Sequence, residues 1–249
     1  MSRRSVTRRH PRHAPQELDE QQLTLAWQSA SLLLGYPDQR LLDRLDLIRR
    51  ACDELPDSVG GPLRATAARL TGCSLTELEA DYVETFDTRR RHSLFLTYFA
   101  HGDTRKRGLA LLRFKQVYQS SGFDLDESGP VGVELPDHLC VVLEYAATID
   151  QEQGRRLLVD HRAGLELLRL SLAEQGSRWA GAVQAVTATF PPMLGDEAEA
   201  IRRLAAEGPP EEEVGLTPYA TPGFDPGPAT PRVSSPTLLP MPSFPGARG

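Results

Sequence analysis

The sequence predicts an all-α protein, in which a single globular multi-helix domain is flanked by disordered N- and C-terminal tails. Apolar residues recur at spacings of three and four from Leu18 onward, which is the period of an amphipathic helix. No stretch alternates apolar and polar residues as a strand would, and no fixed-period repeat appears. The 249 residues are 40% hydrophobic and 25% charged, a mixture typical of a chain that buries a core.

Composition divides the chain into three parts. Residues 1–16 contain five arginines, two prolines and no acid, which predicts a basic disordered tail. Residues 17–206 carry the helical periodicity and form the predicted domain. Residues 207–249 hold eleven of the twenty prolines and six glycines, so we expect a Pro/Gly-rich disordered tail.

Four helices are predicted in the first third of the domain. The first carries the stripe Leu23, Trp27, Ala30 and Leu34 and stops at Gly35 and Pro37; Asp38 then caps a second, with the stripe Leu41, Leu45, Ile48 and Cys52. A third begins near Pro62 and ends at Gly72. Ser74 and Glu77 match a capping box, which starts a fourth helix with Leu75, Leu78, Tyr82 and Phe86 on one face.

The later helices follow from the same period. Asp103 or Thr104 is expected to cap a helix to about Ser121 that buries Ala110, Leu111, Phe114, Val117 and Tyr118. Leu139, Val142, Leu143, Ala146 and Ile149 trace the next helix face, and one further helix runs through Leu158, Leu165, Leu168 and Leu172. Another holds Trp179, Val183, Val186 and Phe190 and is closed by Pro191, and a last short helix holds Ile201 and Leu204.

Charge is distributed unevenly within the predicted domain. The whole chain has a formal charge of −6, whereas residues 82–118 hold eight Arg or Lys against three acids, a charge of 8 − 3 = +5. Arg105, Lys106 and Arg107 fall in the first turn of a helix, where cations oppose the macrodipole. They either pair with nearby acids, lie on a solvated face, or attract an external anion, and the first two are favoured.

An acidic segment follows directly. Residues 124–152 contain eight acids and no Arg or Lys. The basic and acidic blocks either face each other within the fold or present patches to a partner. Among the aromatic residues at helical spacing, most belong to the core, and one or two are expected to line a groove for a helical peptide.

The sequence offers no recognisable enzyme motif or metal-ligand spacing. Glu134, Asp137 and His138 form the nearest candidate for proton transfer, but a cap and a packed histidine are the favoured interpretation. Cys52, Cys73 and Cys140 are expected to be reduced thiols in apolar surroundings. No apolar run reaches the length of a membrane span, so we expect a soluble chain, and the cysteine usage predicts a cytoplasmic protein.

Several segments resemble one protein family. They include Leu32–Asp38, Tyr82–Asp87 with Arg89–Arg91, Leu96–Tyr98 with Gly102–Arg105, Arg107–Lys115, and Glu134–His138 with Val141–Glu144. Together they resemble the delta-chain assembly chaperones of respiratory nitrate reductase, over about residues 20–190. In the wider group of redox-enzyme maturation chaperones, an aromatic motif falls on Tyr82 and Phe86, with Thr85 where leucine is usual. The hinge motif of that group falls on Glu134, Asp137 and His138, with its proline displaced to Pro136.

The resemblance implies a non-catalytic chaperone with an all-helical fold. Its partner would be the apo catalytic (alpha) subunit of respiratory nitrate reductase, including the N-terminal peptide, until molybdenum cofactor is inserted and before membrane assembly. The expected client-binding residues are Tyr82, Phe86, Tyr98, Tyr118, Glu134, Asp137 and His138. No permanently bound cofactor is expected; Arg89, Arg90, Arg91, Arg105 and Arg107 are candidates for transient contact with the client's molybdopterin guanine dinucleotide.

One alternative belongs to another class of function, a nucleic-acid or other anion-binding helical module that uses the arginine-rich segments. The net charge of −6 and the lack of a reading helix or RNA motif disfavour it. We therefore expect no nucleic-acid partner and no direct membrane insertion.

Overall fold

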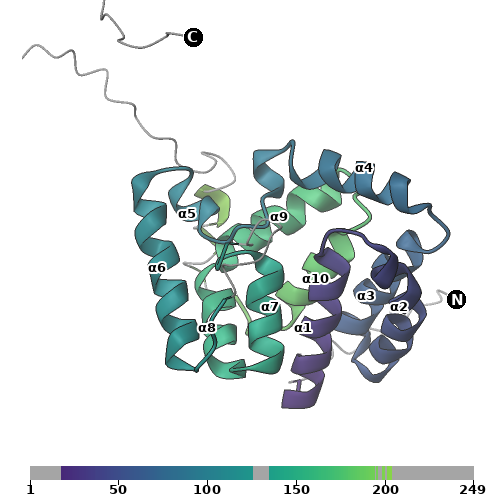
Figure 1. The fold of residues 1–249 in the computed structure, drawn as a ribbon, viewed down its shortest axis with the longest axis horizontal. Helices are drawn as coiled ribbons and strands as arrows, with labels where there is room; N and C mark the ends of the chain where they lie inside the picture. Colours follow the sequence, from purple (N-terminus) through teal and green to yellow (C-terminus); the bar gives the residue numbers. More distant parts are fainter. Residues whose placement is uncertain (1–17, 126–134, 194, 196–197, 200, 204–249) are drawn as a thin grey trace, which may run out of the picture. The chain divides into compact units, whose positions relative to one another are not determined.

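The computed structural model describes residues 18–125, 135–193, 195, 198–199 and 201–203, and this part of the chain is helical, with a single isolated β-bridge. Figure 1 shows the helices in order. They are α1 Glu20–Leu34, α2 Gln39–Ala51, the 3₁₀ helix η1 Cys52–Glu54, α3 Asp57–Leu70, α4 Leu75–Phe86, the 3₁₀ helix η2 Arg90–His92, α5 Tyr98–His101, α6 Arg105–Ser120, α7 Leu139–Thr148, α8 Gln151–Asp160, α9 Arg162–Glu174 and α10 Ala180–Ala188. The all-α prediction is confirmed for these residues, whereas the two predicted tails lie outside them.

The predicted helix starts are largely confirmed, because capping depends on residues close in sequence. The Asp38 carboxylate accepts a hydrogen bond from the Leu41 backbone N–H at 2.7 Å at the start of α2. Ser74 and Glu77 form the expected capping box at the start of α4. Asp19 makes a second capping box at α1, which the sequence reasoning did not identify.

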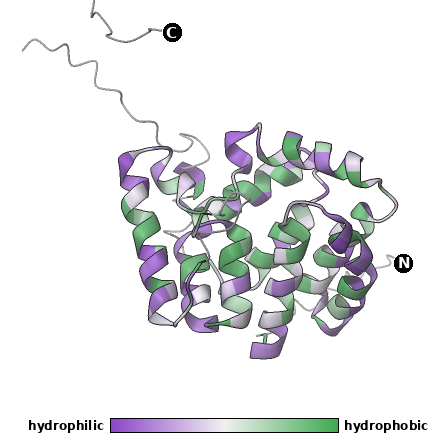
Figure 2. Cartoon of the chain, in the orientation of Figure 1, coloured by the Kyte–Doolittle hydropathy of each residue, from purple (hydrophilic) through white to green (hydrophobic). Residues whose placement is uncertain are grey.

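The core forms where α1, α7, α10, α3 and α9 pack together (Figures 1 and 2). Helix α1 lies against α7 and α10, and α3 lies against α10 and α2. Two tryptophans at the centre, Trp27 and Trp179, have no exposed surface, and the Trp27 indole N–H donates to the Thr189 hydroxyl at 3.1 Å. Helices α7 and α8 approach closely at Gly154, where a Cβ atom would lie 2.3 Å from the Ala146 Cβ.

Two predicted boundaries are wrong. Helix α3 begins at Asp57 rather than near Pro62, because the Pro56 carbonyl accepts the first helical hydrogen bonds. Pro62 lies inside the helix, where it lacks a backbone N–H and so removes one helical hydrogen bond. The single helix predicted through Leu158 and Leu172 is two helices, broken at His161. The break lets α8 pack on α7 while α9 packs on α10 and α5, which a continuous helix would not allow.

Some predicted faces are also less buried than expected. On α6 only Phe114 and Tyr118 are buried, while Ala110, Leu111 and Val117 are half-buried. Ile149 is the C-cap of α7 and is 46% exposed. Ile201 is buried and helical, but its predicted partner Leu204 lies outside the described residues. Cys52 and Cys140 are buried free thiols, whereas Cys73 is half-buried and accepts from the Arg178 guanidinium at 3.0 Å, so its surroundings are polar.

Candidate functional site

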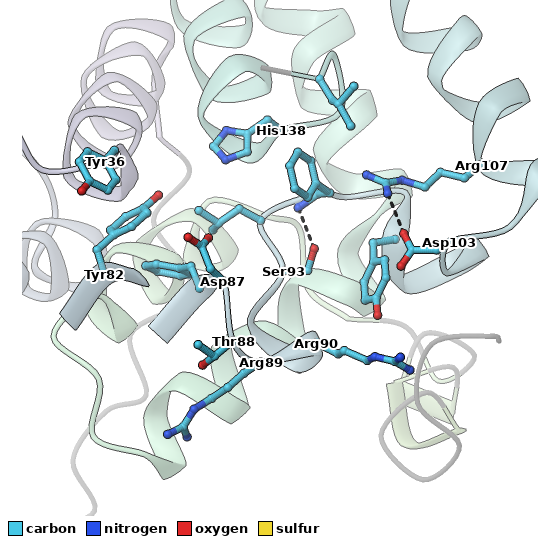
Figure 3. Close-up of a pocket in the computed structure, with 15 residues that line it drawn as sticks. Tyr36, Tyr82, Asp87, Thr88, Arg89, Arg90, Ser93, Asp103, Arg107 and His138 are labelled. Atoms are coloured by element: carbon cyan, nitrogen blue, oxygen red, sulfur yellow. Dashed lines mark hydrogen bonds and ion pairs between the residues drawn. The ribbon is translucent and has the colours of Figure 1, made fainter. Parts of the chain in front are cut away.

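A pocket of about 720 Å³ lies between the end of α4, the segment that leads to α5, the start of α6 and the residues before α7 (Figure 3). We call it the aromatic pocket. It is lined by Tyr36, Tyr82, Phe86, Asp87, Thr88, Arg89, Arg90, Ser93, Leu94, Phe95, Tyr98, Asp103, Arg107, Leu135 and His138. Pockets of this size with aromatic walls and a few polar groups are typical of binding sites.

One wall of the pocket is a stack of aromatic rings. Tyr82 meets Tyr36 edge to face at 5.3 Å and Phe86 at 4.7 Å, and Trp179 supports both Tyr82 and Phe86 from behind. The Tyr82 hydroxyl donates to the Leu34 carbonyl at 2.8 Å, so this ring is fixed by the core. Tyr36 is 54% exposed and lies beside Tyr82 in Figure 3, so it forms the accessible edge of the wall.

The floor of the pocket is a short antiparallel pairing of two distant segments. Phe95 and His138 form an isolated β-bridge, in which Leu96 N–H donates to the Asp137 carbonyl and Leu139 N–H donates to the Leu94 carbonyl. The rings of Phe95 and His138 meet edge to face at 5.3 Å. This pairing brings Asp137 and His138, which belong to the hinge motif of the resemblance, next to the segment Leu94–Leu96.

A buried carboxylate holds the floor in place. The Asp137 side chain has no exposed surface and accepts from the Thr97 backbone N–H at 3.1 Å and from the Thr97 hydroxyl at 2.5 Å. Arg107 lies 3.8 Å from the Asp137 carboxylate, donates to Asp103 at 3.1 Å and covers the Phe95 ring at 5.1 Å. Asp137 is therefore not the N-cap of α7; that position is His138, whose side chain makes no capping hydrogen bond.

Tyr118 supports the floor from below. It is buried, and its hydroxyl donates to the Pro136 carbonyl at 2.6 Å. Burial, followed by the nearby Asp137 charge, raises the pKa of Tyr118, so it remains a neutral donor at physiological pH. Tyr118 and Asp137 thus position the pocket and have almost no surface of their own to offer a ligand.

The five candidate anion-binding arginines all have interactions within the protein. Arg89 pairs with Glu84 at 3.2 Å and also donates to the Gln175 side chain. Arg107 pairs with Asp103, which confirms internal pairing for that residue. Arg90, Arg91 and Arg105 are likewise engaged. Each of these five arginines therefore has an interaction within the chain, and none of them is an unpartnered cation.

The structure gathers much of the predicted site. Tyr82, Phe86, Tyr98, His138, Arg89, Arg90 and Arg107 line the aromatic pocket, whereas Arg91 and Arg105 do not. Glu134 lies outside the described residues. Sequence reasoning missed Tyr36, Asp87, Phe95, Asp103 and Leu135 as lining residues. The sequence held a signal for Tyr36 alone. It is an aromatic residue in the turn that ends the first predicted helix, so its ring is not expected to be buried by that helix and is a candidate for a binding surface.

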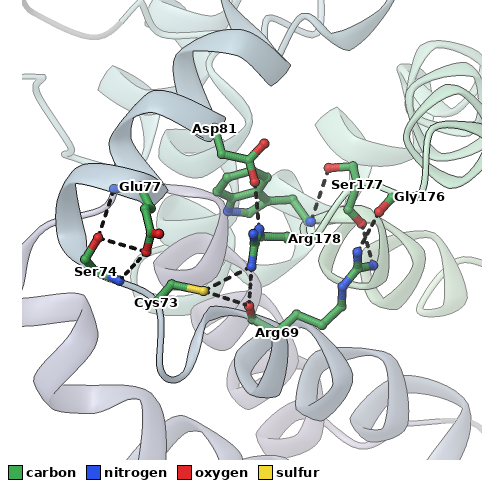
Figure 4. A network of polar contacts seen from close by, with 9 residues as sticks. Arg69, Cys73, Ser74, Glu77, Asp81, Gly176, Ser177 and Arg178 are labelled. Carbon is green, nitrogen blue, oxygen red and sulfur yellow. Dashed lines mark hydrogen bonds and ion pairs between the residues drawn. The ribbon is translucent and has the colours of Figure 1, made fainter.

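A separate network of polar contacts centres on Arg178 and Arg69 (Figure 4). Arg178 donates to Asp81 on α4 at 2.7 Å and to the Arg69 carbonyl on α3 at 3.0 Å. Arg69 donates in turn to the carbonyls of Gly176 and Ser177, before α10. The cluster ties α3, α4 and the turn before α10 together, so its role is structural. Within the described residues there is no group of metal-ligating side chains, and no helix that is long and apolar enough to span a membrane.

Comparison with known proteins gives consistent matches. Residues 52–185, more than half of the chain, match the family model of the nitrate reductase delta subunit. The nitrate reductase-like protein NarX of Mycobacterium tuberculosis is 43% identical over 173 residues, which are 66% of this chain but 24% of NarX. The chain therefore spans about a quarter of the length of that relative.

Shorter relatives match over much of their length. The probable nitrate reductase molybdenum cofactor assembly chaperone NarJ of Bacillus subtilis is 29% identical over 63% of this chain and 83% of its own. The nitrate reductase molybdenum cofactor assembly chaperone NarJ of Escherichia coli is 33% identical over 60% of this chain and 63% of its own. A crystal structure from Archaeoglobus fulgidus, described as a putative redox enzyme maturation protein, superimposes with a TM-score of 0.47 at 23% identity, over 72% of this chain and 97% of that one.

Proposed function

The chain belongs to the nitrate reductase delta subunit family, and on this basis we propose that it is an assembly chaperone for the catalytic (alpha) subunit of a respiratory nitrate reductase. It binds that subunit before molybdenum cofactor insertion and membrane assembly, and it is not an enzyme. The names of the Bacillus subtilis and Escherichia coli relatives support this role, since both proteins are named as nitrate reductase molybdenum cofactor assembly chaperones, the first as a probable one. A cytoplasmic location is part of the same proposal.

The aromatic pocket is the proposed client site, and it is the observation that carries the proposal. Its wall offers exposed ring surface at Tyr36 and partly exposed surface at Phe95, next to an exposed Leu135. Rings and aliphatic side chains of this kind bind an apolar side chain of a helical or extended peptide. The occupant that we propose is the N-terminal peptide of the catalytic subunit.

Carboxylates at the pocket are proposed to steer a basic client peptide. Asp87 and Asp103 line the pocket, and Asp103 already pairs with Arg107. Asp87 makes no ion pair with any described residue, so its charge is available to an approaching cation. Asp137 is buried and accepts a hydrogen bond from the Thr97 backbone N–H. Its replacement by lysine would therefore disturb the fold and would not test whether carboxylates steer the client peptide.

Contact with molybdopterin guanine dinucleotide remains a prediction for Arg89, Arg90, Arg91, Arg105 and Arg107. The internal pairing of Arg89 and Arg107 weakens it. Titration calorimetry of the full chain with the isolated dinucleotide tests it, and absence of heat would end this hypothesis. No observation in the described part of the structure favours the nucleic-acid alternative.

The proposal is tested by capture of the client. The full chain, tagged and co-expressed with the nitrate reductase catalytic subunit, is expected to retain that subunit on an affinity resin. Tyr36→Ala is expected to weaken capture several-fold, about 1 kcal/mol in binding free energy, because an aromatic contact is lost while the buried Tyr82 stays in place. Leu47→Ala is the matched control, since Leu47 is 58% exposed on α2 and does not line the pocket.

The outcomes separate the two parts of the proposal. If the unaltered chain retains no catalytic subunit, the chaperone function is wrong. If it retains the subunit but Tyr36→Ala and Leu47→Ala bind equally well, the function stands and the client binds elsewhere. Nitrate reductase activity in the same cells gives an independent measurement of maturation.

A further inference from the structure

Helix α6 presents an apolar and basic surface on the side that faces away from the core. Leu109 is 68% exposed and Leu112 is 53% exposed, and they lie three residues apart, on the same side of the helix. The exposed residues around them are polar or cationic, and we call the whole set the outer face of α6: Arg105, Lys106, Leu109, Leu112, Arg113 and Gln116.

The outer face is held rigidly from behind. Phe114 and Tyr118, on the opposite side of α6, are 2% and 1% exposed. The Tyr118 hydroxyl donates a hydrogen bond to the Pro136 carbonyl. Arg107 also lies on that inner side and belongs to the aromatic pocket. The outer face is therefore a preformed surface distinct from the pocket, and a partner that binds it need not order the helix first.

The charge of α6 differs from that of the other exposed helices. Several of those helices neutralise an arginine with an acid one turn away, as in Arg49 with Asp46, Arg156 with Glu152 and Arg169 with Glu166. Helix α6 contains five Arg or Lys and no acid; Arg107 pairs with Asp103 just before the helix, whereas Lys106 and Arg113 make no ion pair with a described residue. Figure 2 shows its hydrophilic bands interleaved with hydrophobic ones.

We propose that the outer face of α6 binds an acidic, leucine-bearing amphipathic helix of another protein. Two leucines at a spacing of three form a ridge of the kind that a partner helix packs against, and the apolar contact supplies the burial. Lys106 and Arg113 are seven residues apart, about two helical turns, so both lie along one edge of this ridge, where they complement carboxylates along one border of the partner's apolar stripe. The surface acts in addition to the proposed client pocket and does not depend on it.

An anionic membrane is the competing occupant, and the composition of the face disfavours it. Interfacial helices usually insert an extended apolar face with aromatic residues. The outer face of α6 has two leucines and no aromatic residue, because both aromatic residues of the helix, Phe114 and Tyr118, are buried on the other side. Such a narrow ridge suits one facing helix better than a lipid surface.

Fluorescence anisotropy of the full chain tests the proposal, with a synthetic helical peptide as the probe. The peptide carries leucines at helical spacing, flanked by glutamates, and a fluorescein label. Saturable binding is expected, weakening as salt rises because the paired charges are exposed. Lys106→Glu combined with Arg113→Glu is expected to weaken binding by about tenfold or more. Leu109→Gln combined with Leu112→Gln is expected to weaken it to a similar degree.

The control reverses charge on a comparable surface. Arg44→Glu combined with Arg50→Glu alters two exposed cations near the exposed Leu47 on α2, a helix that also contains acids. This double substitution should change the dissociation constant of the peptide by less than about twofold. Circular dichroism confirms that each variant keeps its helix content. The proposal is overturned if the probe fails to bind, if the α6 and α2 variants lose affinity equally, or if the chain binds phosphatidylglycerol vesicles through Lys106 and Arg113 while ignoring the peptide.

Discussion

Replacing Asp137 by alanine is expected to destabilise the domain, because the carboxylate is the acceptor for two buried donors of Thr97. The Thr97 side chain and the Asp137 side chain both have no exposed surface, and the hydrogen bonds from the Thr97 backbone N–H and hydroxyl measure 3.1 and 2.5 Å. Each buried donor left without a partner costs about 1–3 kcal/mol, so the loss should be about 2–6 kcal/mol. The variant Asp137→Asn keeps one acceptor oxygen in the side chain, and this change should cost only about 1 kcal/mol.

Urea unfolding followed by circular dichroism measures this loss. The midpoint should fall for Asp137→Ala, with an unchanged dependence of unfolding free energy on urea. Asp103→Ala is the control, because the Asp103 side chain is 76% exposed and also pairs with Arg107. Its cost should stay within about 0.5 kcal/mol.

A double-mutant cycle with Thr97→Val identifies the source of the effect. If Asp137 acts through Thr97, the two substitutions together should cost clearly less than the sum of their separate costs. The reasoning is refuted if Asp137→Ala costs no more than Asp103→Ala, or if its effect adds fully to that of Thr97→Val.

Two further predictions concern stability. His92 is buried, with Nδ1 2.8 Å from the Thr85 carbonyl and Nε2 2.9 Å from the Ser171 hydroxyl, and burial lowers its pKa in the folded state. The unfolded state therefore binds more protons, so unfolding free energy should be constant above about pH 6.5 and fall as the pH drops through the lower folded-state pKa. Urea midpoints across this pH range should decline less for His92→Gln, and an equal decline would exclude His92 as the source. Gly154→Ala should cost about 1–3 kcal/mol in thermal or urea unfolding, because its Cβ would lie 2.3 Å from the Ala146 Cβ. Gly108→Ala on α6 is the control, because a Cβ added there would meet no atom within 4 Å; an equal loss in both variants would show that the close contact is not the cause.

Much of the helical structure was predictable from the sequence because it depends on neighbours in the chain. The stripes of α1, α2 and α10 and the caps at Asp38 and Ser74 follow from local spacing and local hydrogen bonds. The errors arose where packing overrode local pattern. An apolar period continues across His161, yet the chain breaks there, since α8 and α9 pack on different helices.

The sequence by itself determined the fold class, most helix boundaries and the family, since period, caps and family motifs are properties of consecutive residues. Only the tertiary structure decided how the candidate site is built. It placed Tyr36 against Tyr82 and Phe95 against His138, and it buried Asp137 as a structural acceptor for Thr97. The physical reason is that these contacts join residues about 40 or more positions apart, whose approach depends on the packing of whole helices and leaves no local signature in the chain.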